Sequence, residues 1–440
     1  MKYLFITTWY FFKAILAYYF GIKKNKQLFY AGQCLIQKLS FRLPDYAYKN
    51  KLIVLYEYRR TVILLWKSQS EKIAVTDGKL ALYDGLEASL NSRCDYLNQC
   101  KGIQPQLLIG RDKLIFCENF IETLLSIFFI TLVSIPVFII SLFTQNSVNL
   151  ALLIKEIAEN KNLLLLTDKS KIKTVHWFCI YEKDANIGAF ILKRFGIEVV
   201  KHLSPVPVTA HNKVIIADKL AIENAYQDEE INFYTETVFF KSKEHYMPES
   251  ANQYMHIYAN NQQECSEKII GYYSHAGWLR MNQQSHRAVF GRYETELELL
   301  NFLPDYLAKN NDVTLIIYPH PKEKRNSVLN DTISFYQDFF NGTNYELVLS
   351  DRKTTEEFHK INLAISTCST VSFERICFGY KTVLYTNGLN DFPLPNTSLS
   401  NICTFSKEEL FRKIDDSLKL TNNEYYQINN LRNYTFLNEM

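Results

Sequence analysis

Short apolar runs alternate with helical patterns in the C-terminal part of the chain. The runs have the length of strands and lie at Lys268–Tyr273, Val313–Tyr318, Tyr345–Leu349, Leu363–Ile365 and Thr382–Tyr385. Amphipathic helical patterns separate them, from Glu294 to Lys309 and from Val371 to Phe378. Strands that alternate with helices predict a parallel sheet with helices on both faces.

The same alternation begins earlier, at Asn162. Strands are expected at Leu163–Leu166, Thr174–Ile180, Ile197–Val200 and Val214–Ile216, and a helix is expected from Ile187 to Arg194, ending at Gly196. The polar stretch from Lys241 to Gln263 indicates a linker. Since 440 residues are enough to bury two cores, we expect an N-terminal α/β domain over residues 1–245 and a C-terminal α/β domain over residues 264–440.

One segment departs from this pattern. Thr123 to Phe143 carries no charged residue over 21 positions and contains Pro136, which kinks or breaks helices. As a helix it roughly matches the thickness of a bilayer core, about 30 Å. A weaker apolar stretch runs from Tyr3 to Ile22, is interrupted by Lys13 and lacks the small-residue cleavage site of a removable signal peptide.

Three interpretations of Thr123–Phe143 compete: a buried core helix, a transmembrane span, and a re-entrant or interface-embedded segment. Strand-like runs flank it on both sides. They lie at Ile73–Val75, Leu107–Ile109 and Leu114–Phe116 before it and at Leu163–Leu166 and Val175–Phe178 after it. If these strands share one sheet, both flanks lie on the same side of the membrane, which a single span forbids. Two spans, the first at Tyr3–Ile22, would instead place residues 23–120 across the bilayer. We therefore favour the third interpretation, a kinked re-entrant or interface-embedded hairpin, as a membrane-associated helical insert at about residues 120–145.

Composition excludes several classes of function. The net charge is only +3 and no basic stripe with interleaved aromatic residues is present, so nucleic acid is not an expected partner. The nine cysteines are scattered without metal-ligand spacing, which fits reduced thiols in a cytosolic setting. The sequence contains no Walker loop, no Gly-x-Gly-x-x-Gly and no Asp-x-Asp motif, so neither a metal nor a cofactor is expected.

Polar residues follow two of the expected C-terminal strands. Tyr318-Pro319-His320-Pro321 ends one strand, and Ser366-Thr367-Cys368-Ser369-Thr370, with Glu374 one turn later, follows another. Ligands bind at the carboxyl ends of parallel strands, and a helix N-terminus attracts anions. Taken singly, a serine before a helix is more often an N-cap and a His-Pro pair more often a turn. Together they predict a site for a phosphate-bearing ligand, and capping is compatible with that role.

The loop after the first C-terminal strand is a further candidate. It contains His275, Gly277 and Arg280. Glycine allows a close backbone approach, and arginine pairs well with phosphate. An ordinary loop is the competing interpretation.

The motifs at Pro319–Pro321 and Ser366–Ser369 resemble the HP and Ser-rich motifs of bacterial capsule and lipooligosaccharide transferases of the polysialyltransferase and lipooligosaccharide sialyltransferase type. They are also similar to motifs of Kdo transferases and of CDP-glycerol polyol-phosphate transferases. The resemblance covers about residues 268–390, whereas the N-terminal half clearly resembles none of these families. It implies the GT-B architecture, in which two Rossmann-like domains flank a cleft and the enzyme needs no metal.

The resemblance also implies roles for individual residues. His320 would contact the donor phosphate or stabilise the departing nucleotide, and Pro321 would fix its loop. The other donor-binding residues expected on this basis are Ser366, Thr367, Ser369, Thr370, Glu374, His275, Gly277 and Arg280. The families place a catalytic Asp or Glu in an N-domain loop, for which Glu182 and Asp184 are the candidates here. Asp184, like Asn186, also suits helix capping, and His211 is the next candidate.

The leading hypothesis is a membrane-associated glycosyltransferase at the cytoplasmic face of a bacterial inner membrane. It would move a sugar from a nucleotide donor, expected to be CMP-linked, to a glycan or glycolipid acceptor in capsule or lipopolysaccharide biosynthesis. One alternative is a CDP-polyol phosphotransferase of the teichoic-acid type. The other is a non-catalytic membrane scaffold of polysaccharide assembly that binds nucleotide only for regulation.

Overall fold

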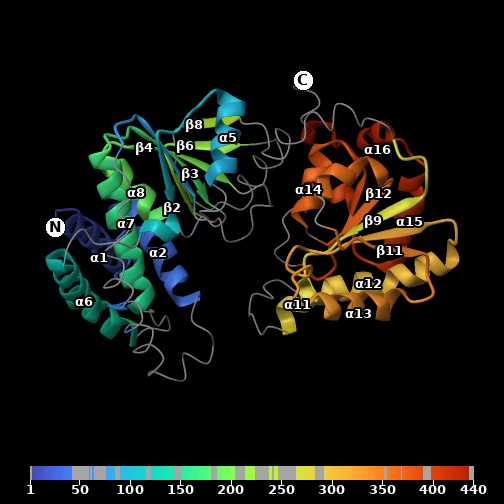
Figure 1. The fold of residues 1–440 in the computed structure, drawn as a ribbon, viewed down its shortest axis with the longest axis horizontal. Coiled ribbons are helices and arrows are strands. Elements are labelled where there is room, and N and C mark those ends of the chain that lie inside the picture. The colour runs from blue at the N-terminus through green and yellow to red at the C-terminus, as the bar shows by residue number, and fades with distance from the viewer. Residues whose placement is uncertain are drawn as a thin grey trace. The chain divides into compact units, whose positions relative to one another are not determined.

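The fold is described from a computed structural model of the chain (Figure 1). The described residues are 2–41, 59, 62–63, 76–84, 90–114, 120–142, 150–179, 186–203, 214–222, 237–239, 242–245, 264–282, 292–350, 354–367, 369–389 and 398–435. They form two units: the first holds the elements from α1 to β8, and the second holds those from β9 to the C-terminal η8.

A parallel six-stranded sheet forms the centre of the first unit. Its strands lie in the order β2-β1-β3-β4-β6-β8. Their bounds are β1 Leu80–Asp84, β2 Leu107–Gly110, β3 Thr174–Cys179, β4 Glu198–Leu203, β6 Lys219–Ile222 and β8 Ser242–His245. Two further strands, β5 (Val214–Ile216) and β7 (Thr237–Phe239), pair with each other in parallel. The strand order reverses between β1 and β3, which makes this the switch point of the sheet.

Helices cover both faces of this sheet (Figure 1). On one face lie α1 (Lys2–Tyr19), α2 (Lys26–Phe41), α7 (Leu150–Lys169) and α8 (Asn186–Arg194), and on the other lies α5 (Leu90–Lys101); η3 (Arg111–Leu114) follows β2. Successive strand residues serve opposite faces: Ala81 and Tyr83 join the core under α7 and α8, while Leu82 joins the core under α5. The strands are apolar on both faces because both faces are covered.

One strand expected from the sequence is wrong. Leu163–Leu166 belongs to helix α7, in which every residue from Glu156 to Thr167 is buried. A helix that is buried all round shows no polar face, so its apolar run has no helical period to distinguish it from a buried strand. The strands and the helix expected at Thr174–Ile180, Val214–Ile216 and Ile187–Arg194 are confirmed to within a residue.

The expected linker is also partly wrong. Its first residues form β8, which pairs with β6 in parallel at the edge of the sheet. The strand Ser-Lys-Glu-His is polar because an edge strand of this kind is only half covered. Of the strand-like runs before the apolar segment, Leu107–Ile109 is confirmed as β2, Leu114 ends η3, and Ile73–Val75 and residues 115–116 lie outside the described residues.

The uncharged segment forms α6 (Phe120–Leu142), a helix that continues through Pro136 and packs on α1 and α7. A search over the helices that the structure describes finds none long and apolar enough to cross a bilayer. The strands on either side of α6, β2 and β3, belong to the same sheet and both pair with β1. The two flanks of α6 are therefore on one side of any membrane that the helix contacts.

The second unit has a parallel six-stranded sheet of its own, in the order β11-β10-β9-β12-β13-β14. Its strands are β9 Ile269–Tyr273, β10 Thr314–Tyr318, β11 Tyr345–Leu347, β12 Leu363–Ser366, β13 Thr382–Tyr385 and β14 Cys403–Thr404. In sequence order this is 3-2-1-4-5-6, the Rossmann arrangement, whose ligand-binding switch point lies between the first and fourth strands. Here those strands are β9 and β12.

Helices again cover both faces of this sheet. One face carries α12 (Arg292–Lys309), α13 (Leu329–Phe340) and α15 (Lys407–Leu418), and the other carries η6 (Thr354–Lys360), α14 (Thr370–Cys377) and α16 (Asn422–Ile428). Three short helices complete the unit: α11 (Gly277–Asn282), η7 (Ser398–Ile402) and η8 (Arg432–Tyr434). Every C-terminal strand and helix expected from the sequence is present, with bounds shifted by one or two residues.

Candidate functional site

The loops that follow β9, β10 and β12 leave the second sheet at one edge. Tyr318 pairs with Tyr273, and Ile365 pairs with Tyr272, so the three strands end at nearly the same level. The loops begin at Ser274, Pro319 and Thr367. They contain most of the C-terminal residues predicted to bind the donor, and they lie at the edge of the sheet that includes its switch point.

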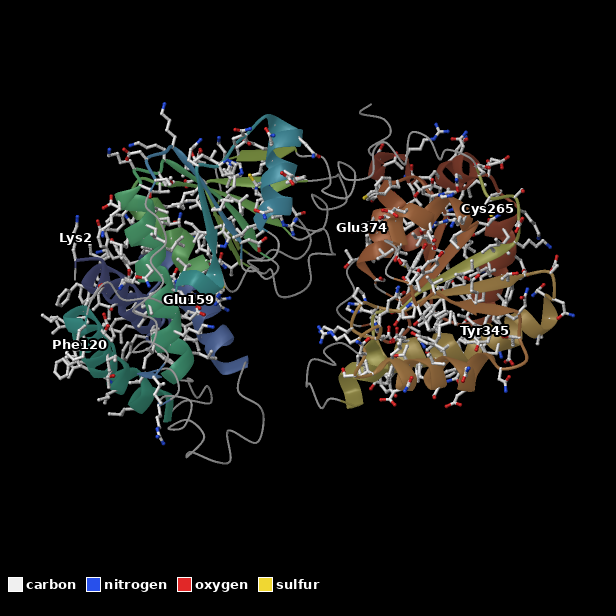
Figure 2. All side chains as sticks on the ribbon, in the orientation of Figure 1. Lys2, Phe120, Glu159, Cys265, Tyr345 and Glu374 are labelled. Atoms are coloured by element: carbon white, nitrogen blue, oxygen red, sulfur yellow. The ribbon has the colours of Figure 1, made fainter. Side chains whose placement is uncertain are left out.

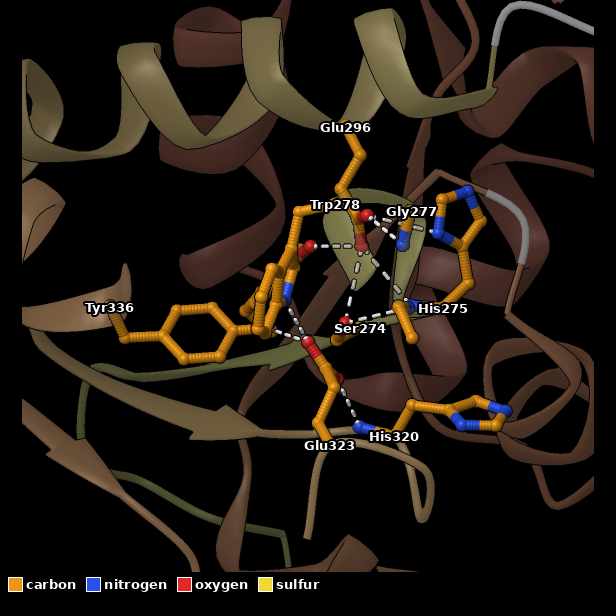
Figure 3. A network of polar contacts seen from close by, with 10 residues as sticks. Ser274, His275, Gly277, Trp278, Glu296, His320, Glu323 and Tyr336 are labelled. Carbon is orange, nitrogen blue, oxygen red and sulfur yellow. Dashed lines mark hydrogen bonds and ion pairs between the residues drawn. The ribbon is translucent and has the colours of Figure 1, made fainter. Parts of the chain in front are cut away.

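A buried carboxylate on α12 holds the first loop (Figure 3). Oε1 of Glu296 accepts hydrogen bonds from the Tyr272 hydroxyl at 2.7 Å and from the backbone N–H of His275 at 3.1 Å. Oε2 accepts from the backbone N–H of Gly277 at 2.7 Å and lies 3.1 Å from Nδ1 of His275. The predicted residues His275 and Gly277 thus belong to a clamp centred on a glutamate that contacts the loop at several points.

The environment keeps Glu296 ionised. Burial by itself raises the pKa of its carboxyl, but the charge and hydrogen bonds of His275 and the hydrogen bond from Tyr272 outweigh burial and lower the pKa to about 2. A charged carboxylate is the stronger acceptor, so the clamp is at full strength throughout the physiological pH range.

Close packing explains the glycine at position 277. A Cβ atom there would lie 2.4 Å from Oε2 of Glu296 and 3.0 Å from Cε1 of His275. The preceding residue, Ala276, has φ of 60°, a left-handed conformation that non-glycine residues rarely adopt. Such local strain persists only where neighbouring contacts hold the backbone, as Glu296 does here.

A second buried carboxylate, Glu323, joins the first loop to the His-Pro loop (Figure 3). It accepts hydrogen bonds from the indole N–H of Trp278, from the Tyr336 hydroxyl at 3.1 Å and from the backbone N–H of His320 at 2.6 Å. Its side chain has no exposed surface, and burial, followed by the nearby charge of Glu296, raises the pKa of its carboxyl. Trp278 and His320 are therefore held from opposite sides by one group.

The His320 imidazole is half-buried and points away from Glu323 (Figure 3). Its Nδ1 accepts a hydrogen bond of 3.1 Å from the backbone N–H of Lys322. In the neutral ring this leaves the hydrogen on Nε2, so Nε2 is a donor. Pro321, between these two residues, is exposed. The loop thus orients the histidine with a donor atom directed away from its own backbone.

The serine and threonine cluster divides into two roles. Ser366 is fully buried and its hydroxyl lies 2.5 Å from that of Ser372, so this pair ties the end of β12 to α14. Ser369 is the N-cap residue of α14, yet its side chain makes no capping hydrogen bond. Thr367 is buried and Thr370 is half-buried beside it. The capping interpretation of Ser369 is therefore wrong, and its hydroxyl and the first N–H groups of α14 are suited to an anion.

Glu374 lies one turn into α14 and projects from it (Figure 2). Its side chain is partly exposed, and desolvation by the surrounding protein raises the pKa of its carboxyl to about 7. No described residue donates a hydrogen bond or an ion pair to it. A carboxyl that is desolvated and unpaired at the carboxyl edge of a parallel sheet is typical of a ligand-binding position.

Several predicted residues are not placed at this edge by the structure. Glu182, Asp184 and His211 lie outside the described residues. Arg280 belongs to α11, but its side chain lies outside the described part of the chain. In the part of the chain that the structure describes, no group of three or more His, Cys, Asp or Glu side chains is arranged to hold a metal ion.

The sequence analysis missed Glu296 and Glu323. Glu296 occupies the same helical face as Leu299, Leu300 and Leu303, and an acidic residue on an apolar face was the available signal. Glu323 follows His320 by three residues within the same turn. Both look like ordinary surface carboxylates unless burial is known.

Neither the family models nor the curated proteins that were searched contain a match to this sequence. Solved structures do resemble it. The chain is similar to S. aureus MnaA in complex with UDP, with a TM-score of 0.46, 10% identity, and coverage of 81% of this chain and 92% of that chain. It is similar to the UDP-GlcNAc 2-epimerase from Neisseria meningitidis bound to UDP-GlcNAc, with a TM-score of 0.44, 11% identity, and coverage of 81% and 94%.

A third similar structure is the wall teichoic acid polymerase TagF, with a TM-score of 0.41, 10% identity, and coverage of 88% of this chain and 92% of that chain. This chain itself is an α/β protein with two Rossmann-like units. At such low identity and TM-score, these likenesses do not identify a ligand for this chain.

Gly277→Ala is expected to destabilise the protein by about 1–3 kcal/mol, because the added methyl group overlaps the Glu296 carboxylate. The usual effect of alanine in place of a helical glycine is the opposite, a gain of about 1 kcal/mol. Chemical denaturation of the two proteins measures the difference. A variant more stable than the parent would show that the clamp has room for a side chain.

Proposed function

We propose that the second unit binds a nucleotide sugar at the carboxyl ends of β9, β10 and β12, and that the chain is a metal-independent glycosyltransferase of the GT-B type. The observation that carries the proposal is that His320, Ser369 and Glu374 all follow the carboxyl ends of the parallel strands on either side of β9, that the Ser369 side chain makes no capping bond, and that no described residue pairs with Glu374. Each supplies a different part of nucleotide recognition.

The proposed roles follow from the chemistry of the groups. Backbone N–H groups at the start of α14 and the Ser369 hydroxyl bind phosphate, while the Glu374 carboxylate accepts hydrogen bonds from ribose hydroxyls. The acceptor hydroxyl attacks the anomeric carbon, the bond from that carbon to the phosphate oxygen breaks, and the nucleotide leaves with the bonding electrons. His320, as an N–H donor, stabilises the charge that develops on the leaving phosphate.

Nucleotide binding is the first test of this proposal. Thermal-shift titration of the full chain with CMP, CDP, UDP and GDP identifies the base and the number of phosphates. Stabilisation by CMP or CDP favours a cytidine-linked donor, and assays with CMP-sugar and CDP-polyol donors then separate glycosyl transfer from polyol-phosphate transfer. Stabilisation by UDP or GDP would still support sugar transfer, with a UDP-linked or GDP-linked donor. Absence of any response would contradict the proposal and favour a non-catalytic scaffold.

Ser369→Ala is expected to weaken nucleotide binding about tenfold while leaving the melting temperature nearly unchanged, because its hydroxyl makes no capping bond. The matched control is Ser406→Ala, since Ser406 caps α15 by accepting from the backbone N–H of Glu409. That control is expected to lose about 1 kcal/mol of stability and no affinity. Calorimetric titration and thermal denaturation of both variants measure the contrast, and equal affinities for the two would remove Ser369 from the site.

His320→Ala is expected to lower the turnover number by about a hundredfold or more, because a leaving group loses its hydrogen-bond donor. His359→Ala serves as the control, since His359 is a partly buried histidine of η6, which leads into the opposite, amino end of β12. Steady-state transfer assays compare the two purified variants. Turnover close to that of the parent in His320→Ala, with the fold intact, would show that the histidine has another role.

Glu374 should make donor binding depend on pH. Ribose hydroxyls donate more strongly to the ionised carboxylate, and only about half of the Glu374 carboxyls are ionised at pH 7 in the free protein. Affinity is therefore expected to rise roughly tenfold from pH 6 to pH 8, as the ionised fraction grows. Calorimetry on the parent and on Glu374→Gln isolates this contribution from titration of the nucleotide itself. An identical pH profile for both would contradict the assignment.

The catalytic base remains a prediction from the sequence. The loop that contains Glu182 and Asp184 connects β3 to α8, at the carboxyl end of a strand of the switch point in the first sheet. We expect Asp184→Asn or Glu182→Gln to lower turnover by about a hundredfold while donor affinity stays constant. Rate measurements paired with donor titration decide between them, and unchanged rates in both variants would redirect the search to His211.

A further inference from the structure

The polarity of α6 is the reverse of that expected for a surface helix. The polar residues near its start, Glu122, Thr123 and Ser126, are buried against the protein, and Thr131 is half-buried. Its apolar residues face outward, and the exposed fraction reaches 68% for Ile121 and 65% for Phe128. The outward stripe consists of Ile121, Leu125, Phe128, Leu132, Ile135 and Ile139, which follow one another at spacings of three and four residues. Exposure of so many large apolar side chains in one row indicates a partner.

Specific contacts hold α6 in this orientation. Lys161 of α7 forms a buried ion pair of 2.8 Å with Glu122, and a buried pair of this kind is costly to break. The rings of Phe5 and Phe129 pack edge to face, with centroids 4.4 Å apart, and join α6 to α1. These contacts fix the orientation of α6, and the apolar side chains are exposed in that orientation. Figure 2 shows side chains projecting from the outer side of α6 around Phe120.

Helix α1 widens the same face. Phe5 and Trp9 are about half exposed, at 49% and 54%. Between α1 and α6 lies a groove of about 760 Å³ whose walls include Phe5, Trp9, Phe12, Phe129, Leu132 and Pro136. Thr8 is the one polar side chain among its lining residues. A groove of this volume and apolar lining fits a hydrocarbon chain better than a polar ligand.

Charge distinguishes the possible partners. The first 44 residues contain seven basic residues and no acidic residue. Lys2, Lys13, Lys23, Lys24 and Lys26 are all exposed, and Nζ of Lys13 lies 4.5 Å from the ring centroid of the exposed Trp9. Lysine beside tryptophan on an apolar face is the composition of proteins that contact anionic lipid headgroups.

A second copy of the chain is a poorer partner for this face. The three-and-four spacing of the stripe also suits a helix seam, but such seams are flanked by charged residues that set register and partner. Thr123 to Phe143 contains no charged residue at all. A lipid surface needs no such register.

We propose that the face formed by α1 and α6 lies on the surface of an anionic bilayer, with the α6 stripe immersed in the lipid and the α1–α6 groove holding one hydrocarbon chain. The helix lies along the membrane and does not cross it, since β2 and β3 on its two sides pair with the same strand. The proposal is independent of the nucleotide site, so either can fail alone. It specifies the surface at which a lipid-anchored acceptor would reach the protein.

Vesicle flotation of the full chain tests the face. We expect binding to vesicles of phosphatidylcholine and phosphatidylglycerol, and at least a tenfold loss of partitioning in the double variant Ile121→Ser/Phe128→Ser. The matched control is Ile428→Ser/Phe405→Ser, which removes equally exposed apolar residues, 67% and 56% exposed, from the second unit. Equal partitioning of the two double variants, or no binding by the parent, would overturn the proposal.

Charge and depth have separate tests. Replacing Lys13, Lys23 and Lys24 with Gln should weaken binding to the anionic vesicles about fivefold per lysine, with little effect on pure phosphatidylcholine vesicles. Brominated lipids should quench tryptophan fluorescence of the parent, and Trp9→Phe should abolish the quenched fraction. Quenching that persists in Trp9→Phe would place another part of the protein in the lipid and contradict the assigned face.

Sedimentation analysis without lipid examines the second-copy alternative. The proposal expects the same mass for the parent and for Ile121→Ser/Phe128→Ser. A dimer that this double variant dissociates, combined with unchanged vesicle binding, would show that the stripe joins two copies of the chain and would overturn the lipid assignment.

Discussion

The candidate site depends on the hydrogen bonds that the buried Glu296 carboxylate accepts. This carboxylate is taken out of water, which costs several kcal/mol. This cost is offset because the Tyr272 hydroxyl of β9 and backbone N–H groups of the loop after β9 donate hydrogen bonds to it. The requirement works in both directions. The loop adopts a left-handed alanine and a glycine without space for a Cβ because the carboxylate needs those donors in place. Removing water from the group therefore shapes the backbone at the edge of the sheet.

The same edge contains groups whose environment is not optimised for stability. Ser369 occupies an N-cap position without making the capping bond, and the Glu374 carboxyl is desolvated without a described partner. Ser406, at the start of α15, shows that this chain caps a helix fully where no ligand site is involved. Unfavourable local arrangements persist where binding requires them, because a ligand supplies the missing partners.

At helix α6 of the first unit, charged groups are buried and apolar side chains are exposed. Lys161 and Glu122 bury an ion pair where apolar residues would be expected, and the apolar residues of α6 face outward. The outward apolar side chains are costly in water and become favourable if the medium outside α6 is lipid, whereas a charged side chain on that outer face would then be costly. The sheet restricts how that contact is made. Since β2 and β3 share β1 as a neighbour, the chain must return to the same side after α6.

The strands and helices of the second unit, the order of its polar loops and the uncharged segment can all be predicted from the sequence. These features are local, because the two-residue period of strands and the 3.6-residue period of helices are written into consecutive positions. His320, Ser369 and Glu374 could be predicted for the same reason, since each lies within a few residues of a strand end or within the first turns of a helix. The family resemblance suggested roles for these residues, but it did not show where their side chains lie.

Features that depend on burial could not be predicted from the sequence and are visible in the folded molecule alone. Leu163–Leu166 was taken for a strand because a helix buried on every side has no polar face to reveal its period. Glu296 and Glu323 were not predicted as site residues because a sequence does not record which residues lose contact with water. The direction in which α6 turns its polar side chains was equally hidden. Desolvation is a property of the packed molecule, set by residues far apart in the chain, and it separates a solvated charge from one that organises a site.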